Sequence, residues 1–182
     1  MSTLNIEFKA VTNKLAELEA LLQQQDPLFV GEDHQVDTYF NIPPNPPESF
    51  GWQAGRLKLR EGNIENALIH YDREDTAGAK ASHVFLYHHK PDKALKEILI
   101  KTLGIKAVVD KRRRIYFIDN VKFHFDIVEG LGTFVEVEAI DKDGSIGKEK
   151  LQEQCNKYAA LFKIAAEDYC SVSYSDMLLQ HI

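Results

Sequence analysis

The amino-acid sequence predicts an α+β fold dominated by antiparallel sheet. Roughly eight segments alternate apolar and polar residues at period two, which is typical of strands with two different faces. Apolar residues at helical spacing predict helices in three places: after the first predicted strand, before a strongly basic segment and near the end of the chain. At least four predicted strands carry charges on one face and apolar residues on the other, so one side of this sheet should be strongly charged.

The clearest pattern lies in residues Val121–Ile140, which predict two strands joined by a turn at Gly130-Leu131-Gly132. The first half alternates apolar residues with three polar ones, Lys122, His124 and Asp126. In the second half, Glu136 and Glu138 project from one face, about 7 Å apart at ~3.4 Å per residue. The plain alternative is a hairpin whose acidic face lies in water, but the same pattern recurs elsewhere with basic residues.

The N-terminal part predicts a strand, a helix and a second strand. Thr3–Ala10 alternates apolar and polar residues, as a strand does. Thr12 or Asn13 can cap the following helix, whose leucines form an apolar stripe. Asp26-Pro27 ends that helix, and Phe29–Ile42 again has the pattern of a strand.

The segment Pro43–Gly55 predicts a loop, because its many prolines cannot belong to the interior of a sheet. Its two large aromatic residues are Phe50 and Trp52. They could pack as a lid or simply anchor the loop, and the sequence does not distinguish these alternatives.

Three short strands are predicted next, over Arg56–Arg60, Asn66–Arg73 and Ser82–His88. The first places Arg56, Lys58 and Arg60 on one face and two leucines on the other. Histidines at the end of the third strand do not predict a metal site, because two of them are sequential and face opposite sides.

The C-terminal half predicts a helix that Pro91 opens and Gly104 ends, followed by a strand over Ile105–Ile118. This strand contains the sequence KRRR, in which Lys111 and Arg113 point one way. Their neighbours Arg112 and Arg114 point the other way and should be solvated. After the hairpin, two helices are predicted, Lys148–Phe162 and a short one over Tyr174–Leu179.

Composition excludes several classes of protein. The 182 residues fit a single domain, 1–182, large enough to enclose a core. The formal net charge of −6 argues against a nucleic-acid-binding or basic membrane-binding surface. Two cysteines form no disulfide framework, so we expect a reducing, cytoplasmic setting. We expect neither a signal peptide nor a membrane span, because no apolar run approaches ~18 residues.

The charged faces could line the interior of a barrel if the sheet rolls up, or could face solvent if it stays flat. In a barrel, seven basic positions would face inward: Lys9, Arg56, Lys58, Arg60, Arg73, Lys111 and Arg113. Four acidic positions would join them: Glu7, Asp126, Glu136 and Glu138. Unpaired buried charges are costly, so such an interior must be wet and occupied by counter-ions. Clustered cations suit a polyphosphate, and clustered carboxylates suit a hard divalent cation.

The segments NIEFKA, GRLKLR, KRRRIYF, FHFDIVEGLGTFVEVE and SYSDMLL together resemble the CYTH superfamily, the triphosphate tunnel metalloenzymes. The class IV adenylyl cyclase-like branch is the most similar one. The resemblance covers nearly the whole chain and implies an α+β fold in which eight antiparallel strands form a β-barrel, or tunnel, with flanking helices. Members of the superfamily include adenylyl cyclases, thiamine triphosphatases, inorganic triphosphatases and RNA 5′-triphosphatases.

The resemblance also assigns roles to individual residues. It implies three metal ligands: Glu7, Glu136 and Glu138. It implies seven phosphate-binding residues: Lys9, Arg56, Lys58, Arg60, Arg73, Lys111 and Arg113. Lys9, Arg113 and Asp126 would act in catalysis, with Asp126 either binding the metal through water or orienting a nucleophile. Asn5 replaces the first carboxylate of the family signature Glu-x-Glu-x-Lys, so position 5 offers a carbonyl oxygen but no charge.

Three functions follow from these expectations. The first is an adenylyl cyclase that converts ATP to cyclic AMP and pyrophosphate with Mg²⁺ or Mn²⁺. The second is a thiamine or inorganic triphosphatase that uses the same ions with water as nucleophile. The third is a binding module for a phosphorylated ligand without turnover, an alternative that the missing first carboxylate leaves open. The expected partner is a nucleoside triphosphate or another triphosphate, with neither nucleic acid nor membrane involved, and a homodimer is left open.

Overall fold

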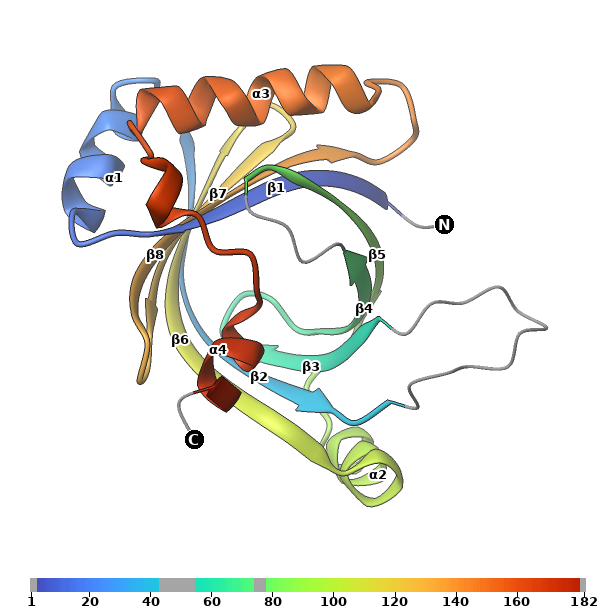
Figure 1. The fold of residues 1–182 in the computed structure, drawn as a ribbon. Coiled ribbons are helices and arrows are strands. Elements are labelled where there is room, and N and C mark those ends of the chain that lie inside the picture. The colour runs from blue at the N-terminus through green and yellow to red at the C-terminus, as the bar shows by residue number, and fades with distance from the viewer. Residues whose placement is uncertain (1–2, 43–54, 74–77, 181–182) are drawn as a thin grey trace.

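The computed structural model describes residues 3–42, 55–73 and 78–180. Within them, eight strands form a closed antiparallel barrel in the order β1-β5-β4-β3-β2-β6-β7-β8 (Figure 1). The strands are β1 Thr3–Val11, β2 Leu28–Phe40, β3 Arg56–Gly62, β4 Ala67–Arg73, β5 Lys80–His88, β6 Ile105–Ile118, β7 Val121–Val128 and β8 Gly132–Asp141. The helices are α1 Leu15–Gln23, α2 Lys93–Leu103, α3 Lys148–Leu161 and α4 Tyr174–Gln180, with a short 3₁₀ turn at Ala166–Asp168. The predicted barrel with flanking helices is confirmed.

The two helices predicted from capping signals differ slightly from expectation at their first residues. Helix α1 has Lys14 as its N-cap, while the Thr12 hydroxyl accepts a hydrogen bond from the Lys14 backbone N–H at 3.0 Å. Helix α2 begins two residues beyond Pro91, because the Asp92 carboxylate accepts a hydrogen bond from the Ala94 N–H at 2.8 Å and caps it. It ends at Gly104 as predicted, where φ is +69°.

Strand β1 closes the barrel by pairing with β5 on one side and β8 on the other. Its register on β8 places Glu7 directly beside Glu138, and Lys9 directly beside Glu136. Residues that are directly opposite in a sheet project from the same face. The charged residues of the first and last strands are therefore brought to one side of the sheet, the interior.

The main hydrophobic core lies outside the barrel, between its wall and the helices α1 and α3. Figure 1 shows α3 across the outer surface of the sheet, where it contacts β1 and β8. Phe123 is fully buried there and meets the ring of Tyr158 edge to face at 4.6 Å between centroids. Burying a side chain of this size contributes about 1.5–3 kcal/mol. Stability therefore comes largely from the outer face of these strands, which leaves their inner face available for charged residues.

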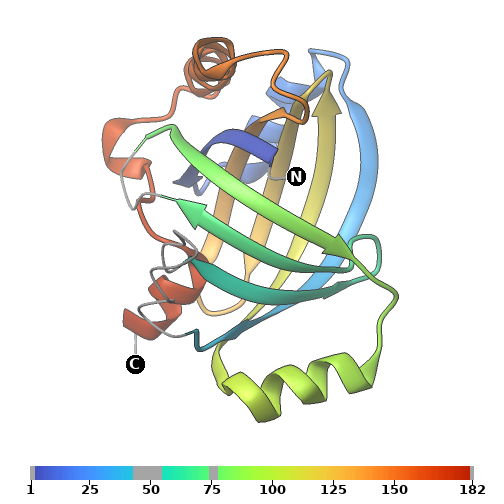
Figure 2. The same ribbon diagram turned by 90° about the vertical axis from the view of Figure 1, so that its right-hand side faces the viewer.

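Figure 2 shows α2 and α3 at opposite ends of the molecule, with the barrel between them. In the described ranges, no helix combines the length and the apolar character needed to cross a membrane. The predicted loop Pro43–Gly55 lies outside the described residues except for Gly55, and so do Phe50 and Trp52.

Candidate active site

The barrel encloses a cavity of about 400 Å³. Most of the predicted site residues line it: Glu7, Lys9, Lys58, Arg60, Lys111, Arg113, Glu136 and Glu138. Each of the strands β1, β3, β6 and β8 contributes two of these residues at alternate positions, and alternate side chains of a strand project from the same face. Arg112 points outward with 69% of its side chain exposed, as predicted. The charged faces of these strands therefore line an interior.

Two predicted site residues, Arg56 and Asp126, do not line this cavity, and the side chain of a third, Arg73, is not described. Arg56 donates a hydrogen bond to Asp176 of α4 at 2.8 Å and lines a second, smaller pocket. Asp126 is completely buried in the barrel wall. Arg73 ends β4, and its side chain lies outside the described part of the chain. The structure shows where the predicted site residues lie, and the roles assigned to all of them stay predictions.

Three cations of the cavity converge on one carboxylate, that of Asp37 on β2. Asp37 accepts hydrogen bonds from Lys58 at 3.0 Å and Lys111 at 2.7 Å. It also accepts two from Arg60, at 2.8 and 2.9 Å. Burial alone would raise the pKa of Asp37, but Arg60, Lys111 and Lys58 hold it well below its usual value. The structure places Asp37 inside the barrel, as the counter-ion of these three cations.

Lys111 is the least exposed cation of this group, with 1% of its side chain accessible. Burial lowers its pKa to about 7 although Asp37 acts in the opposite direction, because Arg60, Arg113 and Lys58 also disfavour another positive charge nearby. A polyanion in the cavity would favour the charged form of the amine. The protonation of Lys111 is therefore coupled to whatever anion binds there.

Glu65, in the turn between β3 and β4, is a second interior carboxylate. It accepts a hydrogen bond from Arg60 at 2.9 Å and forms an ion pair with Lys122 of β7. Burial would raise the pKa of Glu65, but Lys122 and Arg60 lower it well below its usual value. Sequence reasoning assigned no role in the site to Glu65 or Lys122. The alternation in β7 marked Lys122, whereas nothing in the sequence of the turn distinguished Glu65.

Arg113 joins the basic and acidic parts of the cavity. Its guanidinium donates two hydrogen bonds to Asp126, at 2.7 and 2.6 Å, and one to Glu136 at 2.8 Å. The Tyr174 hydroxyl of α4 donates another to Asp126 at 2.8 Å. Burial would raise the pKa of Asp126, but Arg113 lowers it. Asp126 therefore holds Arg113 in place from behind the cavity wall.

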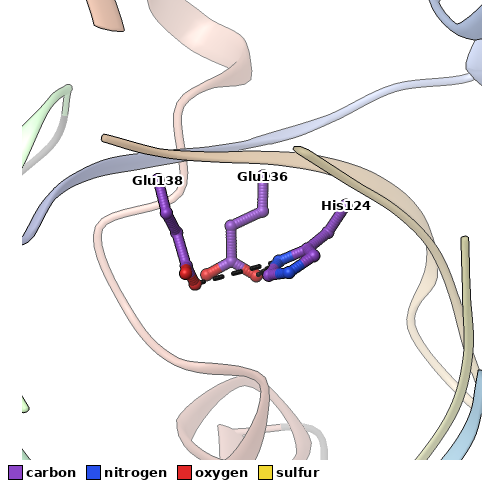
Figure 3. A group of neighbouring side chains, drawn as sticks. All are labelled: His124, Glu136 and Glu138. Atoms are coloured by element: carbon purple, nitrogen blue, oxygen red, sulfur yellow. Dashed lines mark ion pairs between the residues drawn. The ribbon is translucent and has the colours of Figure 1, made fainter. Parts of the chain in front are cut away.

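Beside Arg113, the side chains of His124, Glu136 and Glu138 converge (Figure 3). One potential ligand atom from each lies within 4.8 Å of those of the other two. Burial, Glu136 and Glu7 raise the pKa of Glu138 to about 7. Burial and Arg113 lower the pKa of His124 to about 3, so its imidazole is neutral near pH 7. Among the described residues, neither nitrogen of His124 has a hydrogen-bond partner.

These side chains fit a divalent cation. Carboxylate oxygens are the ligands that Mg²⁺ and Mn²⁺ accept, and a buried imidazole without a partner is a further available donor. Glu136 and Glu138 were predicted as ligands, and Glu7 lies beside Glu138 across the β1–β8 ladder. His124 was missed, although its alternation with Lys122 and Asp126 placed it on the same face of β7.

The fold resembles several solved structures. PH1012 protein from Pyrococcus horikoshii matches with a TM-score of 0.74 and 22% identity, over 94% of this chain and 98% of that one. A Vibrio parahaemolyticus protein called a "putative adenylate cyclase" matches with a TM-score of 0.73 and 18% identity, over 98% and 99%. A Hippeastrum protein called a "putative adenylyl cyclase", with a dominant triphosphatase activity, matches with a TM-score of 0.58 and 13% identity, over 98% and 95%. Identities this low establish the shared fold alone.

No protein of curated function matches the sequence significantly. The CYTH domain family matches residues 3–168, which is most of the chain. The closed barrel with its charged interior agrees with this match. The chain therefore belongs to the CYTH domain family.

Proposed function

We propose that this protein is a metal-dependent enzyme that converts ATP to cyclic AMP and pyrophosphate inside the barrel. The observation that carries the proposal is the cavity itself, in which a group of cations and a group of carboxylates line one space of about 400 Å³. That volume lies within the range of pockets that bind small organic ligands, ~300–1,000 Å³.

The cations would bind the phosphate chain. Lys58, Arg60 and Lys111 are already oriented toward a single anionic group, the carboxylate of Asp37. Phosphate oxygens accept charge-assisted hydrogen bonds from the same donors, so a triphosphate can share these cations with Asp37 or replace it. Lys9, whose Nζ lies 4.2 Å from the centre of the Tyr174 ring, supplies a further positive charge beside the carboxylates.

The carboxylates would hold the cation. Glu136 and Glu138, with Glu7 on the neighbouring strand, present oxygen ligands suited to Mg²⁺ or Mn²⁺. A bound divalent ion supplies charge neutralisation and polarises phosphoryl oxygens. Arg113 adds a fixed positive charge at the boundary between the two groups, because Asp126 prevents it from turning away.

In cyclisation, the ribose 3′-oxygen forms a bond to the α-phosphorus while the bond from that phosphorus to the oxygen bridging to the β-phosphate breaks. The 3′-hydroxyl proton leaves to a base, and pyrophosphate departs with the bridging oxygen. The cations of the cavity stabilise the charge that accumulates on the departing pyrophosphate.

An apolar wall supports an organic substrate over inorganic triphosphate. Strands β4 and β5 contribute Ile69, Tyr71, Val84 and Leu86 to the cavity lining. Inorganic triphosphate has no apolar surface to bury against them, whereas a nucleobase or another aromatic group does. Hydrolysis of an organic triphosphate is the second candidate, because it uses the same cations and carboxylates and because the Hippeastrum protein of this fold has a dominant triphosphatase activity.

A product assay tests the proposal. Purified protein is incubated with ATP, thiamine triphosphate or tripolyphosphate, each with Mg²⁺ or Mn²⁺, and the products are separated by chromatography. Cyclic AMP with equimolar pyrophosphate supports the cyclase. Orthophosphate without cyclic AMP refutes it in favour of hydrolysis, and no turnover of any substrate, combined with measurable binding, refutes both in favour of a binding module.

A further inference from the structure

Among the described residues, the imidazole of His124 has no hydrogen-bond partner. It lies directly opposite Glu136 in the β7–β8 ladder, with only 1% of its side chain exposed. Nδ1 lies 3.5 Å from a Glu136 oxygen and 3.8 Å from a Glu138 oxygen, both longer than the ~2.7–3.2 Å of an ordinary N–H···O hydrogen bond. Within the described residues, Nε2 also lacks a partner.

Packing alone does not account for an imidazole at this place. A buried polar atom without a partner costs about 1–3 kcal/mol, which an apolar side chain of similar size would avoid. The alternating residues on the other face of β7, Phe123 and Phe125, show that this strand carries apolar side chains where it packs against the core. His124 faces the cavity and lines it, so its partner should be something that enters the cavity.

The surroundings of the imidazole indicate which partner fits. The ligand atoms of His124, Glu136 and Glu138 lie within 4.8 Å of one another. Two donors on opposite sides of a small divalent ion lie about 4.0–4.4 Å apart, from metal–ligand distances of ~2.0–2.2 Å. The spacing of the three ligand atoms is therefore close to that of donors that share one ion.

We propose that His124 is a nitrogen ligand of the divalent cation and that the site consequently prefers first-row transition ions such as Mn²⁺ and Co²⁺ to Mg²⁺. This inference rests on the cation site of the proposed function. Mg²⁺ binds oxygen ligands almost exclusively, whereas an imidazole adds affinity for transition ions, increasingly so from Mn²⁺ to Co²⁺. Two carboxylates alone would discriminate weakly, so the imidazole sets the preference.

Equilibrium binding of the metals alone, without substrate, tests this inference. Isothermal titration calorimetry measures Kd for Co²⁺, Mn²⁺ and Mg²⁺ in wild-type protein and in His124→Asn. We expect the wild type to bind Co²⁺ at least tenfold more tightly than Mg²⁺. The variant should lose about ten- to a hundred-fold in Co²⁺ affinity, the range seen when a metal site loses a supporting group, and less than threefold for Mg²⁺.

A matched control is His34→Asn, which removes a half-exposed imidazole that is paired with Asp110 outside the cavity. It should leave all three Kd values unchanged. Circular dichroism verifies that both variants fold. If His124→Asn does not fold, wild-type protein loaded with one equivalent of Mn²⁺ still gives an answer, because electron spin echo modulation detects a directly coordinated nitrogen.

Equal losses for Co²⁺ and Mg²⁺ in His124→Asn would overturn the inference, because they indicate a structural effect without selectivity. Unchanged Co²⁺ binding or missing nitrogen modulation would overturn it as well. These readouts are independent of turnover. A protein that binds Co²⁺ through His124 but produces no cyclic AMP would refute the cyclase and leave this inference intact.

Discussion

Asp37 should be essential for the stability of the empty barrel, because it neutralises three cations in the interior. The substitution Asp37→Asn keeps the size of the side chain but removes its charge. Four charge-assisted hydrogen bonds lose their ionic acceptor, and Lys58, Arg60 and Lys111 then repel one another in a buried place. Removing one partner of a buried ion pair costs about 3–5 kcal/mol.

That cost corresponds to a large fall in melting temperature. In a chain of this size, each kcal/mol shifts Tm by about 2–4 °C, so Asp37→Asn should lower Tm by roughly 6–20 °C. The loss should be larger at pH 6 than at pH 9. In the wild type, Lys111 has a pKa of about 7, so its charge interacts with Asp37 at pH 6 but is absent at pH 9, and the variant loses that interaction. Differential scanning calorimetry at both pH values measures the effect.

Tripolyphosphate should reverse most of this loss. A bound polyanion supplies the negative charge that Asp37→Asn lacks, and ligands that bind only the folded state raise its stability. Saturating tripolyphosphate should therefore raise Tm more in the variant than in the wild type. The control is Asp110→Asn, which breaks a half-exposed pair with His34 and should cost less than about 1 kcal/mol. If Asp37→Asn is no more destabilising than this control, the charged interior does not depend on Asp37 and the reasoning is refuted.

Three further predictions concern the cavity. Glu136→Gln should abolish divalent-dependent turnover without changing the circular dichroism spectrum, and retained activity would contradict the proposed role of Glu136 as a metal ligand. Lys58→Met should reduce kcat/KM with any triphosphate by roughly ten- to a hundred-fold, because the loss of one charge-assisted hydrogen bond costs ~1.5–3 kcal/mol. Arg112→Met, on the outer face, should change almost nothing, and equal losses would place the two side chains in the same environment. The proposed function assigns phosphate binding to the protonated form of Lys111, so tripolyphosphate affinity should fall up to tenfold per pH unit above about 7. Calorimetric titrations of Lys111→Met with tripolyphosphate should lack this dependence of affinity on pH. A pH profile identical to that of the wild type would contradict the coupling between Lys111 protonation and anion binding.

Period-two alternation predicted most of the strands and the faces on which many of the site residues lie. Alternation orients a side chain to one face independently of distant residues, so Lys58, Lys111 and Glu136 were placed correctly on the charged faces, and these faces line the cavity. The same pattern placed Arg112 on the opposite, outer face. What remained open was which face points inward, because only closure of the barrel decides that.

The side-chain partners of three residues, which the sequence did not show, depend on contacts between distant segments. Asp37 belongs to β2, where polar residues occupy both faces, so alternation could not indicate its orientation. Arg56 lies at the first position of β3, where Asp176, 120 residues further along the chain, reaches it. Asp126 was assigned the right face, but its burial follows from Arg113 directly across the β6–β7 ladder. Side-chain partners across strands are fixed by register, which the sequence does not show.

The position of β1 between β5 and β8 has a consequence for the order in which the chain can fold. Leu4 pairs with His83 on one side and with Asp141 on the other. During synthesis, β1 can join β5 long before β8 has left the ribosome, which leaves an open sheet with an unpaired edge that carries Ile6 and Phe8. Contacts between such distant residues form slowly, and unpaired edges promote association between chains. We therefore expect refolding to be slow and prone to aggregation until the segment that ends at Asp141 covers this edge.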